Sequence, residues 1–101
     1  MQEKLKCCFC GKELIEMRER HNPEPLNCDE GTVCCTECNI TIVRPFRRIV
    51  WKPWVDKEME RKITEHFRSL SVEMLRKTLP QEMLYEKDKW DRYIKQLNIG
   101  L

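Results

Sequence analysis

Two cysteine pairs constrain the fold of this chain more than any other feature of its sequence. Cys7 and Cys10 enclose two residues in "CCFCG", and Cys35 and Cys38 repeat that spacing in "CCTEC". Two thiolates at this spacing can bind one ion where the backbone turns sharply, and Gly11 permits such a turn. Four soft thiolates in a tetrahedron suit Zn²⁺ better than Mg²⁺ or Ca²⁺. The spacing therefore predicts one structural zinc ion held by Cys7, Cys10, Cys35 and Cys38.

Three further cysteines leave alternatives open. Cys8, Cys28 and Cys34 are free under this assignment, and free cysteines commonly pack as small apolar residues. Cys8 or Cys34 could instead replace its neighbour as a ligand, and Cys28 could replace a member of either pair. The pattern is also compatible with an iron–sulfur cluster or with a head that binds no metal. A disulfide framework is disfavoured because the chain has seven cysteines, an odd number.

The length and composition indicate a small protein whose core needs additional stabilisation. The chain has 101 residues, of which 41% are hydrophobic and 36% charged. So small a core usually relies on disulfides or a metal. The sequence predicts a small α+β protein with a cysteine-rich head that contains short strands. It divides into a zinc-binding head with a basic connector (residues 1–53) and a helical tail (residues 54–101), packed as a single domain.

Short elements are expected in the head. Leu14–Ile15 and Val33 are typical of brief strands between turns. A helix is predicted from Thr36 to Val43. It should end there, because Pro45 biases the residue before it away from helical geometry.

The tail is expected to hold two or three helices. Apolar residues recur near the 3.6-residue period from Trp54 to Leu70. Ser71 is a candidate N-cap for a second, short helix. Pro80 suits the first turn of a third helix over residues 80–97, with Asn98 beyond its end. The apolar stripe of this last helix could also support a homodimer.

The connector "RPFRRIVWKPW" mixes basic and aromatic side chains. Guanidinium groups bind carboxylates and phosphates bidentately, and indole rings stack on bases or bind apolar partners. The segment could pack the head onto the tail, form a surface for a protein partner, or contact nucleic acid. The candidate partner-binding residues are Arg44, Phe46, Arg47, Arg48, Trp51, Lys52 and Trp54.

Charge and hydropathy narrow the partner classes. The formal net charge is +2, and four thiolates around one Zn²⁺ would add −2 and cancel it. Nucleic-acid binding must therefore rest on local clusters rather than on bulk charge. No apolar run approaches the roughly 20 residues that cross a bilayer, and the start "MQEKLKCC" lacks an apolar signal core. These features predict a cytoplasmic protein with no membrane partner.

The segments "CFCGKELI", "HNPEPL" and "VCCTECN" resemble the treble-clef layout, in which a zinc knuckle and a hairpin precede a second cysteine pair that opens a helix. They are also similar to small zinc-knuckle proteins encoded by phages and mobile elements. The resemblance covers about residues 5–48 and implies zinc binding, the head fold and a phage origin.

"CTECN" also looks like the second knuckle of HNH endonucleases, a family that uses a histidine base and a divalent ion. His21 is the only candidate base, its spacing to Pro25-Leu26 is one residue too long, and no histidine follows Asn39. We therefore predict that the chain is not an enzyme.

Taken together, the residues and the resemblance predict a non-enzymatic, zinc-stabilised protein-interaction module. The phage resemblance implies an inhibitor or adaptor of a host protein in the host cytoplasm. The alternative is a small nucleic-acid-binding protein that uses Arg44, Arg47, Arg48 and Lys52, and a degenerate HNH-type nuclease is less favoured.

Overall fold

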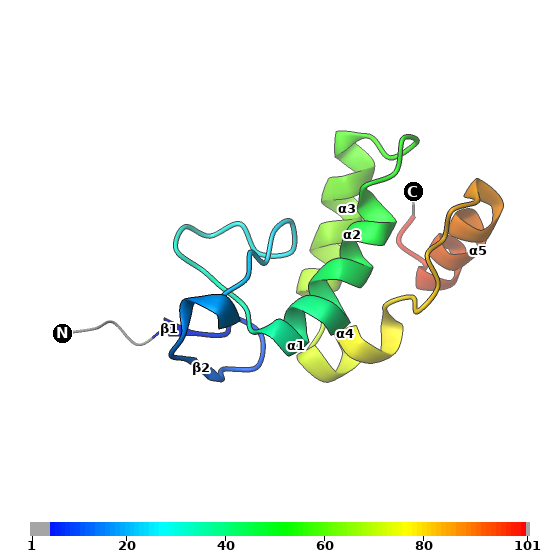
Figure 1. The fold of residues 1–101 in the computed structure, drawn as a ribbon. Helices are drawn as coiled ribbons and strands as arrows, with labels where there is room; N and C mark the ends of the chain where they lie inside the picture. Colours follow the sequence, from blue (N-terminus) through cyan, green and yellow to red (C-terminus); the bar gives the residue numbers. More distant parts are fainter. Residues whose placement is uncertain (1–4, 101) are drawn as a thin grey trace.

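A computed structural model describes residues 5–100 and shows a small α+β fold (Figure 1). Strands β1 (Leu5–Lys6) and β2 (Glu13–Leu14) pair antiparallel, with Leu5 opposite Leu14. The predicted fold class is confirmed: a cysteine-rich head with short strands precedes a helical tail. The remaining elements are η1 (Met17–Glu19), α1 (Thr36–Cys38), η2 (Asn39–Val43), α2 (Arg44–Val50), α3 (Lys57–Arg68), α4 (Val72–Thr78) and α5 (Lys87–Leu97).

The predicted end of the first helix before Pro45 is wrong. The segments α1, η2 and α2 follow one another without a break, so the helix runs from Thr36 through Pro45 to Val50. The turn before the proline is π-helical, and the N–H of Arg44 donates to the carbonyl of Asn39, five residues back. Proline has no backbone N–H to donate, and its ring clashes with the carbonyl four residues before it in a regular α-helix. A π turn shifts the hydrogen-bond register at this point. Proline is thus accommodated at the start of α2.

The tail helices begin at side-chain caps. The Asp56 carboxylate accepts a hydrogen bond from the N–H of Met59 at 2.8 Å and starts α3. Ser71 caps α4 as predicted, and its hydroxyl accepts from the N–H of Met74 at 3.2 Å. Each cap satisfies one of the N–H groups that a helix N-terminus leaves unpaired.

The predicted start of the last helix at Pro80 is also wrong, because α5 begins only at Lys87. The preceding loop buries Leu84, whose φ of 52° is incompatible with a right-handed helix. Burying this side chain outweighs local helix propensity. Asn98 adopts the left-handed conformation that ends α5, as expected past a helix end. Within residues 5–100 no helix is long and apolar enough to span a membrane.

One cluster of buried side chains extends from the head into the tail. Phe46 is fully buried in α2 and packs edge-to-face on Phe67 of α3, with ring centroids 5.5 Å apart. The indole N–H of Trp90 in α5 donates to the carbonyl of Ile49 at 2.8 Å. In Figure 1, α2 and α3 run alongside each other, with α5 at the end of the molecule away from the head. The division at residues 53 and 54 stays a prediction.

The packing of Phe46 gives a test of this core. Phe46→Ala should lower the free energy of unfolding by about 3–5 kcal/mol, because it leaves a cavity beside Phe67. Urea denaturation of the metal-loaded protein measures this loss. The control Met17→Ala, at a side chain 81% exposed, should change it by less than about 0.5 kcal/mol. If Phe46→Ala does not fold, Phe46→Leu should show a smaller loss; equal stability of Phe46→Leu and wild type would contradict the packing.

Candidate metal centre

The first cysteine pair lies in a tight turn that follows β1. The N–H of Cys7 donates to the carbonyl of Lys12 at 2.8 Å, and the N–H of Gly11 donates to the carbonyl of Cys7 at 3.0 Å. Gly11 has a φ of 78°, a conformation that glycine adopts without steric cost. The N–H groups of Phe9 and Cys10 point at the Cys7 sulfur, at 3.4 and 3.5 Å. The backbone of this turn thus directs two N–H groups at one sulfur.

The second pair lies at the N-terminus of the long helix. Cys35 is the N-cap of α1, and its sulfur accepts from the N–H of Cys38 at 3.3 Å. This bond satisfies one of the N–H groups that a helix start leaves unpaired. Cys38 follows in the first turn with no exposed surface. One helical turn thus presents two sulfurs on the same side.

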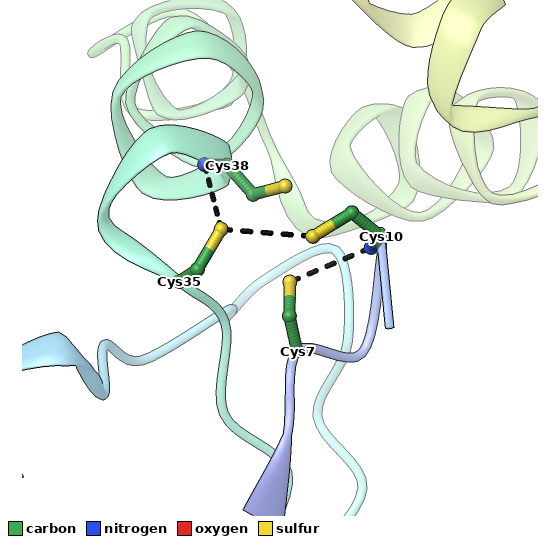
Figure 2. A group of neighbouring side chains, drawn as sticks. All are labelled: Cys7, Cys10, Cys35 and Cys38. Carbon is green, nitrogen blue, oxygen red and sulfur yellow. Dashed lines mark hydrogen bonds between the residues drawn. The ribbon is translucent and has the colours of Figure 1, made fainter. Parts of the chain in front are cut away.

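The two pairs meet at one point (Figure 2). The four sulfur atoms of Cys7, Cys10, Cys35 and Cys38 all lie within 4.8 Å of one another, and those of Cys10 and Cys35 are 3.8 Å apart. A tetrahedral ion with metal–sulfur bonds of about 2.3 Å places its sulfurs about 3.8 Å apart. In the described part of the chain no other group of three or more His, Cys, Asp or Glu side chains could hold an ion. The donor set therefore fits one tetrahedral metal ion.

The thiols of this group differ in their affinity for protons. Burial acts to raise the pKa of Cys7, but hydrogen bonds from the backbone of Cys10, Cys35 and Phe9 together lower it to about 7. Burial raises the pKa of both Cys38 and Cys10 above the ordinary thiol value. A metal ion must displace the protons of these thiols to bind. Of these three thiols, Cys7 loses its proton most readily.

The three remaining cysteines lie outside this group. Cys34 is fully buried, and its backbone N–H donates to the carbonyl of His21 at 2.9 Å. Burial raises the pKa of Cys34 to about 12 and that of half-buried Cys8 to about 11, so both thiols stay protonated. Cys28 is exposed, and its thiol donates to the carbonyl of Pro25 at 3.5 Å. The geometry gives Cys34 the packing role that its apolar character favours.

Arg76 contacts the metal-binding group from α4, far away in the sequence. Its guanidinium donates to the sulfur of Cys38 at 3.5 Å and lies 3.8 Å from a carboxylate oxygen of Glu37. Four thiolates around a divalent ion carry a net charge of −2, which a guanidinium partly offsets. Nothing in the sequence pattern pointed to Arg76, because 38 residues separate it from Cys38. The contact joins the tail to the metal-binding group.

His21 lies beside the start of the long helix. Its Nε2 is 2.9 Å from the hydroxyl oxygen of Thr36, and its backbone pairs with Cys34. His21 belongs to no metal-binding group among residues 5–100.

The basic–aromatic connector divides between core and surface. Phe46 has no exposed surface, so it cannot contact a partner, and its candidacy as a partner-binding residue is corrected. Trp54 is half-buried and packs edge-to-face on Trp90, with centroids 5.9 Å apart. Trp51 is 62% exposed. The helical period accounts for the division, since Phe46 faces α3 whereas Arg44 is exposed and Arg47 and Arg48 are partly exposed.

Two basic side chains of the connector donate hydrogen bonds to backbone carbonyls. Arg47 donates to the carbonyls of Glu24 and Asn22, both at 2.9 Å, and its guanidinium lies 5.0 Å from the centre of the Trp51 ring. Lys52 donates to the carbonyl of Met83 at 3.0 Å. The ammonium of Lys52 also lies 5.5 Å from the centre of the exposed Tyr85 ring, which sequence reasoning missed.

Comparisons of the chain with protein-family models, with curated proteins and with solved structures found no match. The resemblance to phage-encoded zinc-knuckle proteins therefore stays a prediction.

Exchange of one ligand tests the metal centre. Cys38→Ser should abolish stoichiometric metal binding and unfold the head, because one thiolate of a closed set is lost. Elemental analysis of protein purified without chelator and circular dichroism measure the two effects. The matched control is Cys28→Ser at an exposed cysteine outside the group. Equal metal content in the two variants would contradict the assignment.

Exchange of Arg76 tests its contact with Cys38. Arg76→Met should weaken metal affinity about 10-fold, the lower end of effects seen for outer ligand contacts, with Arg76→Lys intermediate. Competition with a chromogenic chelator measures the affinity. Lys77→Met on the same helix, where Lys77 pairs only with Glu73, should leave it unchanged. An equal affinity of Arg76→Met and wild type would show that the contact does not support the metal.

Proposed function

We propose that this protein is a non-enzymatic, zinc-stabilised protein-interaction module. The observation that carries the proposal is the group of four sulfurs, Cys7, Cys10, Cys35 and Cys38, all within 4.8 Å of one another. Zinc bound by four protein thiolates is of the structural kind, since catalytic zinc keeps one position open for water or substrate. The thiolate set also favours zinc over the hard cations that nucleases use. The metal would stabilise the fold, and the surface would supply the function.

The position of the cysteines supports a scaffold role. Two of the four sulfurs come from a hairpin of two-residue strands, which is too short to be stable alone. The other two open the helix that runs to Val50 and carries the exposed Trp51 at its end. A metal at this point would fix the direction of that helix and thereby the surface that it presents.

The partner in this proposal is a protein of the host. The resemblance of "CFCGKELI", "HNPEPL" and "VCCTECN" to phage-encoded zinc-knuckle proteins supports a role as inhibitor or adaptor. Reduced cysteines are compatible with action in the cytoplasm, where thiols are not oxidised to disulfides.

Nucleic-acid binding is the second candidate, and the exposure of Trp51 favours it. An exposed indole beside Arg44, Arg47 and Arg48 is what base stacking and phosphate binding require. The balance of charge is against it, because zinc bound by four thiolates brings the formal net charge to zero.

Affinity purification from the native host tests the proposal. The tagged, zinc-loaded protein should retain a stoichiometric host protein after nuclease treatment, both at about 50 mM and at about 400 mM salt, because an apolar interface resists salt. The control bait is Cys38→Ser, whose surface should be lost with its metal. Retention of nucleic acid alone, released as salt rises, would favour the second candidate. Metal-dependent nicking of plasmid DNA that disappears in His21→Ala would overturn the non-enzymatic role.

A further inference from the structure

The outward side of the long helix carries a row of basic and apolar side chains. Arg44, Arg47, Arg48 and Trp51 follow the spacing i, i+3, i+4 and i+7, which places them on one face of α2 and the residue after it. Ile40, 52% exposed, precedes them in η2. Of the residues between them, Thr41 is half-buried and the others are buried. We call these five residues the arginine face.

The positive charge of this face has no counter-charge in the described structure. Within residues 5–100, none of the three arginines has a carboxylate oxygen within 4.0 Å, and the sequence from Cys38 to Val55 contains no Asp or Glu. Arg61 of α3, by contrast, lies between Glu58 and Glu65, which bind it at 2.5 and 2.7 Å. The arginine face is thus left with charge that a ligand could neutralise.

Part of the face is held in place before any ligand binds. The guanidinium of Arg47 is fixed by the carbonyls of Glu24 and Asn22, and it covers one side of the Trp51 ring at 5.0 Å. Arg44 and Arg48 make no side-chain hydrogen bond in the described part of the chain. Binding would therefore cost little conformational entropy at Arg47 and Trp51, which are already ordered, while Arg44 and Arg48 keep their donors available for a ligand.

We propose that the arginine face binds an acidic segment of the partner protein, with carboxylates on Arg44 and Arg48 and an apolar side chain against Trp51. This inference rests on the proposed function and names the chemistry of the partner. Guanidiniums bind carboxylates bidentately, and exposed Trp and Arg are the residues that most often dominate binding at protein interfaces. From Ile40 to Trp51 the face extends about 16 Å, enough for a short segment.

Two features favour a protein segment over a nucleic acid. Ile40 adds an exposed aliphatic side chain at the other end of the face. This side chain can pack against an apolar residue of a peptide but cannot bind a phosphate. The zero net charge of the zinc-loaded chain also gives no long-range attraction for a polyanion. A few local charge pairs, by contrast, suffice for an acidic peptide.

Selection from a random 12-residue peptide display library tests the inference. Peptides that bind the zinc-loaded protein should be enriched in Asp or Glu together with a Leu or an aromatic residue. Arg44→Glu with Arg48→Glu should weaken binding of the best fluorescent peptide at least 10-fold, because carboxylates then face carboxylates. The matched control is Lys89→Glu with Arg92→Glu, the same charge change at two exposed residues of α5. The control should bind like wild type.

Several outcomes would overturn the inference. Selection of neutral or basic peptides, selection of none, or equal binding by the Arg44→Glu, Arg48→Glu variant would each contradict it. A labelled 15-nucleotide single-stranded DNA that binds more tightly than the peptide, and is released as salt rises, would assign the face to nucleic acid instead. If the Arg44→Glu, Arg48→Glu variant still retains the host protein in the affinity purification, the assignment of the arginine face is wrong and the proposed function stands. If wild type retains none, the proposed function itself fails.

Discussion

The convergence of four thiolates is the constraint on which the rest of this structure depends. Two sulfurs come from a hairpin with strands of two residues each, and two from the first turn of a helix. Without a metal, four thiolates at this separation would repel one another, so the four sulfurs do not all lose their protons together. With one, the same sulfurs would join the hairpin to the start of the helix. A bound ion would close a head that has few hydrogen bonds between its strands.

The metal-binding group is connected to the tail through the helix and through one side chain. Cys38 belongs to the helix that continues through Pro45, so a fixed sulfur also fixes the helix that carries Phe46 in the core. Arg76 makes the second connection, from α4 to the sulfur of Cys38. Head and tail are therefore joined by covalent, apolar and charge-assisted contacts at one place. The outward side of the same helix carries the arginine face.

Sequence reasoning could predict what depends on local spacing. The Cys-x-x-Cys pairs gave the metal-binding group, and the hydroxyl of Ser71 gave a helix start, because both depend on residues a few positions apart. It failed at Pro45 and Leu84, where burial in the core outweighed local propensity. It could not find Arg76, whose contact with the site depends on how α4 packs. Exposure of each connector residue likewise required the tertiary structure.

X-ray absorption at the zinc edge tests the central claim most directly, because it counts the ligand atoms around the ion. Protein purified without chelator should give four sulfur neighbours at about 2.3 Å and no nitrogen or oxygen neighbour. Such a spectrum would match the group formed by Cys7, Cys10, Cys35 and Cys38. Fewer than four sulfurs, a nitrogen or oxygen ligand, or protein that holds no zinc at all would contradict the account.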